Sequence, residues 1–421
     1  MDALAGGLGR DFRPAGEGEE ADYVVVGTCT VTADADVASR RAVRRAARQH
    51  PRARIFVTGC YAEVDPRGLA ALPGVAAVVG ARALGALPEL LSLVHRGAAP
   101  GPALARAAVA APAWTGPPRD SLEHARVILK VQDGCDAGCS YCAVPAARGR
   151  ARSLPFEEAL ARLAALRRRH AEVVLAGVRL GAYGRDLSPR RSLAELVSAA
   201  VGAGLAGRLR LSSIEPSEFP LGLLRQARTA RILCEHFHLP VQSGSDRVLG
   251  AMRRPYRAGA IASLVEEIAL GMPDACIGAD VMVGFPGETA ADHQATLRLL
   301  SSLPLAYLHV FPWSPRPGTP AAGMAGRVGA ALVRERAREM QSLSARRWRR
   351  FLAAQSGREL EVVVERTEGG ASRGTSRRYV PVRWPGCGDE RGTLARVRIE
   401  SSDGTECLGV RTGASSGRIR P

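Results

Sequence analysis

Short apolar runs and longer amphipathic stretches alternate along most of this chain. The runs at residues 23–27 and 55–59 are rich in β-branched side chains, and residues 33–49 between them have the spacing of an arginine-rich helix. A strand, a helix and a second strand of these lengths are typical of a parallel βαβ unit. Because Cys29 and Cys60 follow the two runs, we expect both at the carboxyl edge of an open parallel sheet, where such sheets bind ligands.

Six further strand-like runs occupy the middle of the chain, and helical patterns separate them. Their starts are on average about 36 residues apart, which suits consecutive βα units that close into a partial parallel barrel. The segments after the runs are rich in glycine, cysteine and polar residues, and barrel enzymes hold their active sites at this edge. The six runs are residues 127–132, 172–176, 209–214, 237–241, 277–283 and 307–311.

The last quarter of the chain has a different pattern. Residues 326–351 form a predicted helix with eight arginines and two glutamates, and short β-rich runs follow at residues 361–365, 379–383 and 395–400. Gly-rich turns between these runs indicate a small antiparallel β-barrel. The predicted fold class is therefore α/β, with an open flavodoxin-like parallel sheet first, a partial barrel of six βα units second and a small β-barrel last.

Five prolines and no periodic pattern between residues 97 and 119 indicate a linker. A chain of 421 residues with 46% hydrophobic residues is long and apolar enough for two to four packed domains, which excludes disorder as its main state. We expect four segments, at residues 1–96, 97–120 (the linker), 121–355 (the barrel with its basic helix) and 356–421.

The formal net charge of +17 indicates a polyanionic partner such as nucleic acid. Lys130 is the single lysine among 58 basic residues, so the preference for arginine reflects a GC-rich codon bias and is not itself evidence for RNA. The charge is concentrated in the helix at 326–351 and in residues 39–54, which hold seven arginines and no acid. Such uncompensated segments exceed what an ordinary solvated helix face carries.

Three of the nine cysteines form a tight group. Cys135, Cys139 and Cys142 are spaced by four and three residues in a Gly-rich loop after the first barrel strand. Three thiolates suit a 4Fe-4S cluster with one open iron, whereas structural zinc needs four ligands, and the nearest further candidate, His124, precedes the strand. Zinc and three buried structural thiols remain the alternatives.

This group, in its context, resembles the signature of radical S-adenosylmethionine enzymes, and the chain from about Ala21 to Gly409 resembles their methylthiotransferase branch. Within that branch, the motifs TCTVT and SSIEP most resemble enzymes acting on N6-threonylcarbamoyladenosine beside the tRNA anticodon. Further matching blocks are VVGTCTVTADAD (25–36), VTGCYAEVDP (57–66), KVQDGCDAGCSYCAVPAARGRARS (130–153), HFHLPVQSGSDRVLGAMRRPY (236–256), DVMVGFPGET (280–289) and HVFPWSPRPGTPAAGM (309–324).

The resemblance implies that Cys135, Cys139 and Cys142 hold three irons of a cluster whose fourth iron binds S-adenosylmethionine. Cleavage of that cofactor would give a deoxyadenosyl radical that removes hydrogen from C2 of the adenine, so no catalytic residue is implied beyond the ligands of the cluster and the cofactor. The family usually has Asn where this chain has Arg179. The residues expected to bind S-adenosylmethionine are Gly177, Glu215, Gln242, Gly284 and Gly287, with helix capping as the alternative role of Glu215.

The resemblance also implies a second 4Fe-4S cluster, which provides the inserted sulfur, with Cys29 and Cys60 as two of its three ligands. Two cysteines buried at strand ends are the alternative. The family's first ligand would lie on a strand a few tens of residues before Tyr23, so we expect this chain to lack that strand and that ligand. Either the start codon has been placed too far downstream, or the second cluster has two thiolate ligands instead of three and is defective. About eight irons per chain would indicate a complete second cluster, and about four would indicate its loss.

The expected partners are the tRNA anticodon loop and a low-potential electron donor such as flavodoxin or ferredoxin. The C-terminal β-barrel resembles the TRAM RNA-binding domain of tRNA-modifying enzymes, and Tyr379 and Trp384 either stack on bases or belong to its core. Residues 1–12 show no secretory signal, and no apolar run approaches the roughly 18 residues of a membrane span, so we expect a cytoplasmic protein without membrane association.

The predicted function is insertion of a methylthio group at C2 of N6-threonylcarbamoyladenosine in tRNA by radical chemistry. The alternatives are a sister methylthiotransferase acting on isopentenyladenosine in tRNA or on a ribosomal-protein aspartate, another radical enzyme such as a methylase, and a non-enzymatic, metal-stabilised RNA-binding protein. A methylase would not need Cys29 and Cys60, and a binding protein would not cleave S-adenosylmethionine.

Overall fold

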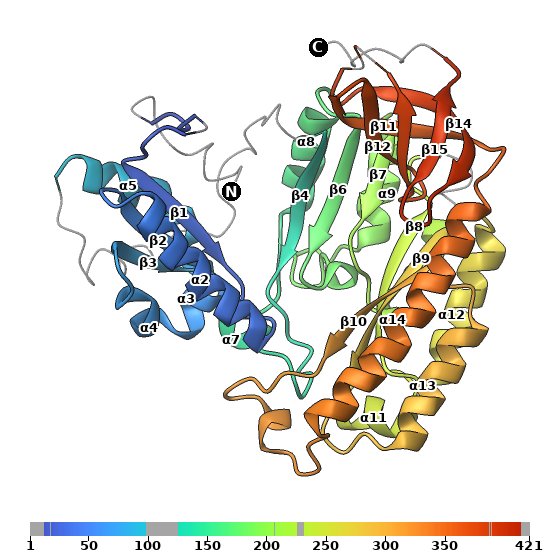
Figure 1. Cartoon of the computed structure of the whole chain (residues 1–421), viewed down its shortest axis with the longest axis horizontal. Helices are drawn as coiled ribbons and strands as arrows, with labels where there is room; N and C mark the ends of the chain where they lie inside the picture. The colour runs from blue at the N-terminus through green and yellow to red at the C-terminus, as the bar shows by residue number, and fades with distance from the viewer. Residues whose placement is uncertain are drawn as a thin grey trace. The chain divides into compact units, whose positions relative to one another are not determined.

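The computed structural model describes residues 12–16, 18–97, 125–205, 207–224, 231–386, 388 and 390–413. These residues belong to two compact units, which Figure 1 colours by residue number. The first unit comprises the described residues up to 97 together with 134–150 and 314–323, and the second comprises 125–133, 151–313 and 324–413. The predicted linker lies, apart from Gly97, outside the described residues.

The first unit is built on a parallel sheet of order β1-β2-β3, with β1 (Tyr23–Thr28), β2 (Arg54–Gly59) and β3 (Val75–Gly80) (Figure 1). The two predicted strands and the predicted helix α2 (Ala33–Gln49) are confirmed, whereas β3 was missed. Thr32 caps α2 by accepting a hydrogen bond from the Ala35 N–H at 3.1 Å. The unit's other elements are α3 (Cys60–Val64), α4 (Pro66–Ala70), η1 (Ala81–Ala86), α5 (Leu87–His95), α7 (Val144–Arg148) and η5 (Pro320–Gly323).

Helices cover both faces of this sheet. Ile55 of the central strand packs in a buried cluster with Val43 of α2, whereas its neighbour Phe56 packs in a second cluster with Leu87 and Leu91 of α5. Successive strand residues point to opposite faces, so the alternation in β2 places a core on each side. A parallel sheet buried on both faces is the expected open α/β arrangement.

The second unit contains all six predicted barrel strands, arranged in two sheets of order β5-β4-β6-β7 and β10-β9-β8. A parallel bridge between Leu209 and Leu233 and a hydrogen bond from Ile214 N to His238 O at 2.9 Å join β7 to the β8 side. The pairs β4–β6, β6–β7, β8–β9 and β9–β10 are parallel, and β4–β5 is antiparallel. The strands are β4 (Arg126–Asp133), β5 (Arg152–Ser153), β6 (Glu172–Gly177), β7 (Arg208–Leu211), β8 (His236–Gln242), β9 (Cys276–Val283) and β10 (Tyr307–Pro312).

Helices follow the strands of this partial barrel, and the long basic helix α14 (Ala330–Ala353) packs along β10 and ends the series (Figure 1). The helix begins four residues later than predicted. The others are α8 (Phe156–Arg167), η3 (Leu180–Ala182), α9 (Leu193–Gly202), η4 (Pro216–Glu218), α11 (Asp246–Ala251), α12 (Ala258–Gly271) and α13 (Ala290–Ser302). No described helix is long and apolar enough to span a bilayer.

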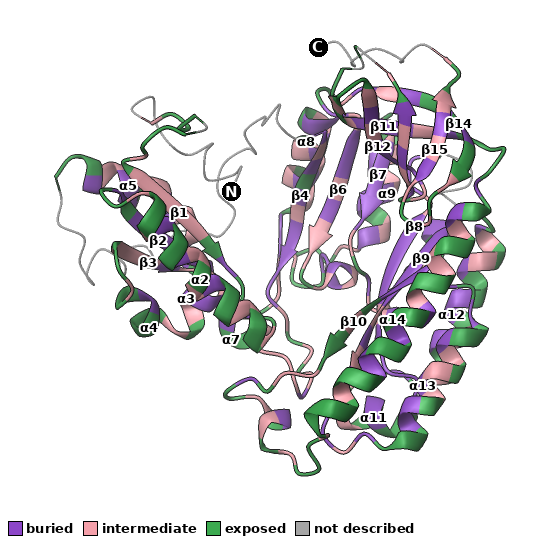
Figure 2. Ribbon diagram, viewed as in Figure 1, coloured by how far each residue is buried: buried purple, intermediate pink, exposed green. Residues whose placement is uncertain are grey.

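The C-terminal strands close into a barrel of order β11-β12-β13-β15-β14, and many of their residues are buried, coloured purple in Figure 2. The predicted small β-barrel is confirmed; its strand pairs are antiparallel except that β13 and β15 run parallel. Trp384 is 1% exposed in the core of this barrel, so of the two roles expected for it, core packing is the one observed. The strands are β11 (Glu359–Glu368), β12 (Ala371–Ser376), β13 (Pro381–Pro385), β14 (Leu394–Ser402) and β15 (Cys407–Arg411).

Buried charges fix the C-terminal barrel to the amino ends of the core strands. The Glu172 carboxylate is fully buried and contacts both Arg208 and Arg210. Arg208 also donates to the carbonyl of Glu361 at 2.8 Å, and Arg210 donates to the carbonyl of Ser376 at 3.0 Å. These two arginines therefore join β7 to β11 and β12, and each buried guanidinium has both an anionic and a carbonyl partner.

Candidate functional site

The three-cysteine loop lies in the first unit and follows Asp133, the last residue of β4. Gly134 has φ 69°, and a Cβ at this position would collide with the carbonyl oxygen of Arg150, so only glycine fits. The N–H of Cys135 donates to the carbonyl of Gly149 at 3.1 Å and closes the base of the loop. The loop therefore has a fixed start and end, with the cysteines between them.

Backbone donors point at the cysteine sulfurs. The N–H of Ala137 lies 3.4 Å from the Sγ of Cys135, and the N–H of Val144 lies 3.5 Å from the Sγ of Cys142. Such N–H···S bonds stabilise thiolates that carry negative charge from an iron-sulfur cluster and tune its potential. Together with Cys139, these half-buried cysteines fit a 4Fe-4S cluster bound by three thiolates.

Cys29 and Cys60 lie at one edge of the parallel sheet, as the pattern predicted. Thr28 pairs in register with Gly59, so the cysteines that follow them leave the sheet side by side. The Ser39 hydroxyl clamps the main chain of Cys29, accepting from its N–H and donating to its carbonyl, both at 3.2 Å. Cys29 is exposed and Cys60 half-buried, and their role as cluster ligands stays a prediction.

An arginine connects the two groups of cysteines within the first unit. Arg148, at the end of α7, donates from Nε to the Sγ of Cys60 at 3.1 Å. Because α7 follows the three-cysteine loop, this contact brings Cys60 near that loop. Sequence reasoning missed Arg148, and its only signal was a basic residue six positions after Cys142.

The segment Ser314–Gly323 contacts residues next to both groups, although it lies far along the chain. Arg316 is 3% exposed; its Nη1 pairs with Asp36 at 2.8 Å, and its Nη2 also bonds Thr30. The N–H of Ala321 donates to the carbonyl of Ser140 in the three-cysteine loop at 2.8 Å. The sequence shows that this segment follows the sixth strand-like run of the barrel. It does not reveal the buried ion pair beside Cys29.

The residues predicted to bind S-adenosylmethionine lie in the second unit. Gly177 ends β6, Gln242 ends β8, and Gly284 and Gly287 follow β9. Because these strands are parallel, the four residues share the carboxyl edge of the partial barrel. Their contact with the cofactor stays a prediction.

Arg336 of α14 holds the loop after β9 in place. The Glu288 carboxylate accepts from the N–H of Gly284 and from Arg336, each at 2.7 Å. Both members of this ion pair are almost fully buried. The loop is therefore a fixed wall of the carboxyl edge.

Glu215 has an arginine partner rather than a capping role. It precedes the short helix η4 without a side-chain cap bond, and its carboxylate pairs with Arg254. Burial raises the pKa of Glu215, while Arg254 opposes that shift. Arg179, which stands where the family usually has Asn, pairs with Glu218 at 2.8 Å.

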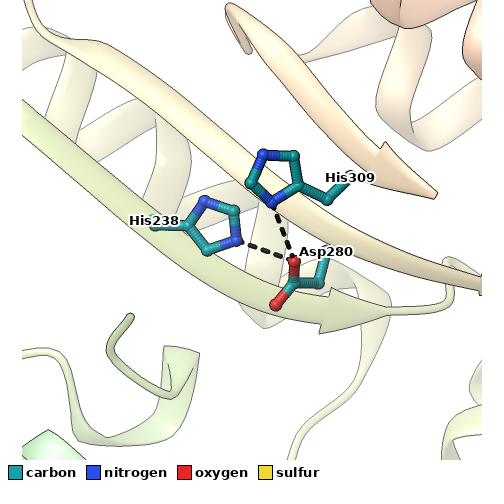
Figure 3. Close-up of side chains that lie close together, drawn as sticks. All are labelled: His238, Asp280 and His309. Carbon is teal, nitrogen blue, oxygen red and sulfur yellow. Dashed lines mark hydrogen bonds and ion pairs between the residues drawn. The ribbon is translucent and has the colours of Figure 1, made fainter. Parts of the chain in front are cut away.

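Three side chains of β8, β9 and β10 converge inside the second unit (Figure 3). Asp280 Oδ1 lies 2.8 Å from His238 Nε2 and 3.5 Å from His309 Nδ1, and the Tyr307 hydroxyl lies 3.0 Å from His238 Nδ1 and 2.8 Å from His236 Nε2. One proton arrangement satisfies the chain: His236 donates to Tyr307, Tyr307 to His238, and His238 to Asp280. Although three such ligands could hold a divalent cation, hydrogen bonds already account for the cluster.

Two family models match this chain. The Radical SAM superfamily matches residues 129–300, and the Uncharacterized protein family UPF0004 matches residues 2–80. The first match includes the three-cysteine loop, and the second includes Cys29 and Cys60. Both cysteine groups therefore lie in regions with a family match.

Curated relatives cover most of the chain. A threonylcarbamoyladenosine tRNA methylthiotransferase of Treponema pallidum is 35% identical over 82% of this chain and 82% of its own length. The enzyme of the same name from Bacillus subtilis is 32% identical over 93% of this chain and 87% of its own length. A tRNA-2-methylthio-N6-dimethylallyladenosine synthase of Parafrankia is 36% identical over 87% of this chain and 75% of its own length.

Among solved structures, the chain resembles the radical S-adenosylmethionine methyltransferase TsrM from Kitasatospora setae, with cobalamin and a 4Fe-4S cluster bound. The TM-score is 0.53 at 16% identity, over 72% of this chain and 66% of that one. At this identity the likeness concerns the fold alone.

Proposed function

Since this chain belongs to the radical S-adenosylmethionine methylthiotransferase family, we propose that it acts on N6-threonylcarbamoyladenosine in tRNA and adds a methylthio group at C2 of the adenine. The family assignment makes the protein a tRNA-modifying transferase that uses S-adenosylmethionine and iron-sulfur chemistry. It also excludes the alternative of a non-enzymatic RNA-binding protein.

The extent of the matches carries the substrate proposal. The chain covers 82%, 91% and 87% of three relatives named for threonylcarbamoyladenosine. It covers 75%, 68% and 74% of three named for dimethylallyladenosine, at a similar 36% identity. A longer shared length at similar identity favours the first substrate.

Within this proposal, Cys135, Cys139 and Cys142 hold the cluster that binds S-adenosylmethionine. When bound, that cluster supplies one electron for reductive cleavage of the cofactor. The chain's own part is positioning: backbone N–H groups stabilise the sulfurs, and the carboxyl edge of the partial barrel binds the cofactor away from bulk water. Cys29 and Cys60 are proposed as ligands of the family's second cluster.

The proposal includes two partners. The enzyme needs a low-potential reductant, for which flavodoxin or ferredoxin is the proposed source. The closed C-terminal β-barrel is the proposed tRNA-binding domain of the TRAM type, because small barrels on tRNA-modifying enzymes commonly bind RNA. The proposed compartment is the cytoplasm, where tRNA is modified.

Mass spectrometry of tRNA nucleosides tests the substrate. Deletion of the gene should remove 2-methylthio-N6-threonylcarbamoyladenosine and leave its unmethylthiolated precursor, and the intact gene should restore the product. Loss of the methylthiolated isopentenyladenosine instead would contradict the proposal, as would methylthiolation of a ribosomal-protein aspartate with unchanged tRNA. Reconstituted protein with tRNA carrying one or the other precursor gives the same comparison in vitro.

A further inference from the structure

A cavity with an aromatic wall lies in the second unit, between the start of β10, the middle of α14 and the C-terminal barrel. Its volume is about 380 Å³, and its lining is mostly apolar. Four rings contribute to the wall: those of Tyr307, His309, Trp348 and Tyr379. The role proposed above for the carboxyl edge does not use this cavity.

The Tyr307 ring is held in place from three sides. His236 and His238 both bond its hydroxyl, and the Trp348 ring meets it edge-on at 5.8 Å and 84°. A Cβ at Gly278 would collide with the ring, so glycine in β9 makes room for it. The wall is therefore preformed, which lowers the entropy cost of binding a flat ligand.

Tyr379 is presented at the cost of backbone strain. Its φ is 62°, a left-handed conformation that a bulky residue seldom adopts, and 37% of the residue is exposed. One ring face stacks on His236 with centroids 4.2 Å apart at 18°. The Arg210 guanidinium lies 5.5 Å from the ring centroid, and the part of Tyr379 that these contacts leave uncovered lines the cavity.

The helix turns beside the cavity are cationic. Arg346, Arg349 and Arg350 flank Trp348 on α14 and are exposed, and none of them forms a salt bridge with a residue that the structure describes. Residues 340–353 contain no acid. A cationic track beside aromatic rings is what single-stranded nucleic acid requires, because phosphates pair with the arginines and bases stack on the rings.

We propose that this cavity binds the base of an unpaired nucleotide of the tRNA anticodon loop, with the adjoining phosphates on Arg346, Arg349 and Arg350. The inference rests on the proposed function insofar as tRNA is the substrate. Gln341, which also lines the cavity, offers an amide to a base edge. Tyr307 begins β10, so roughly 15 Å of strand separates the cavity from the carboxyl edge, and the bound base is a different one from the modified base.

Replacement of Tyr379 separates binding from folding. Tyr379→Asn removes the ring and suits the left-handed backbone, so the variant should fold as well as the parent. We expect its affinity for the anticodon stem-loop RNA to fall about 10-fold, with Tyr379→Phe within about twofold of wild type. Fluorescence anisotropy gives the affinities, and the same stem closed without the anticodon loop is the control RNA, whose binding should not change.

Trp348→Leu gives an independent test, with Trp348→Phe as its matched control. The leucine variant should lose stem-loop affinity by a similar factor. Arg349→Gln should reduce the slope of log affinity against log salt concentration by the amount expected for about one phosphate contact. Basal cleavage of S-adenosylmethionine without RNA should stay unchanged. Wild-type affinity of both Tyr379→Asn and Trp348→Leu would overturn the proposal, as would an equal loss for the control RNA.

This test is distinct from the test of the substrate. The cavity proposal concerns a base other than the modified one, so an enzyme specific for isopentenyladenosine would still show the cavity effect. Conversely, nucleoside mass spectrometry can confirm threonylcarbamoyladenosine while the cavity variants bind normally, and only the cavity proposal would then fail. Photocrosslinking of the stem-loop should label the peptides that contain Trp348 or Tyr379; crosslinks confined to other peptides would count against it.

Discussion

Arg148 Nε donates a hydrogen bond to Cys60 Sγ at 3.1 Å. The guanidinium belongs to the helix that follows the three-cysteine loop, and the sulfur belongs to the edge of the parallel sheet. A fixed positive charge beside an expected cluster ligand stabilises negative charge on that sulfur. The pair thus places a positive charge from the helix after the three-cysteine loop against the Cys60 sulfur.

Replacement of Arg148 by methionine keeps the volume but removes the charge. In reconstituted protein we expect the reduction potential of the cluster held at Cys60 to fall, because its reduced, more negative form loses a donor. Potentiometric titration followed by electron paramagnetic resonance measures this shift. Arg148→Lys is the charge-conserving control, and an unchanged potential in the methionine variant would show that Arg148 only packs against Cys60.

The two cysteine groups should separate cofactor cleavage from sulfur insertion. Alanine at Cys135, Cys139 or Cys142 should abolish cleavage of S-adenosylmethionine by dithionite-reduced protein. The double replacement of Cys29 and Cys60 should retain cleavage and lose methylthiolated product, because the family's second cluster provides the sulfur.

Chromatography of the cleaved cofactor and mass spectrometry of the tRNA measure the two activities. Cys407→Ala is the matched control, since Cys407 is buried in the C-terminal barrel, and it should retain both activities. Methylthiolation that survives without Cys29 and Cys60 would mean that these cysteines are not part of the sulfur-inserting site.

Glu172 is the anion between two buried arginines, so Glu172→Gln should destabilise the second unit strongly. Breaking a buried pair from one side typically costs about 3–5 kcal/mol, because the remaining charges lose their partner. Urea unfolding measures the loss. Glu195→Gln on α9 is the control, because its pair with Arg191 is exposed and such pairs contribute about 0–1 kcal/mol. Similar losses of unfolding free energy in Glu172→Gln and Glu195→Gln would contradict the strong stabilisation assigned to Glu172.

The same carboxylate predicts an acid-dependent loss of stability. Burial opposes its ionisation, but Arg208 and Arg210 outweigh burial and lower the pKa of Glu172 to about 2. The contribution is therefore complete above the ordinary glutamate pKa of about 4.5 and is lost as the pH falls towards about 2. Unfolding midpoints between these limits should fall more steeply for wild type than for Glu172→Gln, and parallel curves would contradict the assignment.

The ion pair of Arg316 and Asp36 should show energetic coupling. Either Arg316→Met or Asp36→Asn leaves one partner without its counter-charge, whereas the double variant removes both. We expect the double variant to lose about 0.5–3 kcal/mol less than the sum of the single losses. A double-mutant cycle of thermal or urea unfolding measures the coupling, and strictly additive losses would show that the pair does not stabilise the first unit.

Much of the fold followed from local pattern. The strands β1, β2 and most of the six barrel strands are runs rich in β-branched and other apolar residues, which buried parallel strands need, whereas β7 (RLRL) alternates arginine with leucine. By contrast, β12 (ASRGTS) and β15 (CLGVR) carry small and polar residues, and only their neighbours in the closed barrel make them strands. Strand β3 was missed for a similar reason, because its alanines give a weak local signal.

For the candidate site, the sequence by itself determined the thiolates. Their spacing, their Gly-rich loop and their place after strands are local properties that chain order alone conveys. The tertiary structure alone decided which distant residues meet: Arg148 and Cys60, Arg316 and Asp36, and Tyr379 and His236. A buried ion pair, a sulfur contact or a ring stack joins residues far apart in the sequence, so no window of sequence contains it and only the folded chain reveals it.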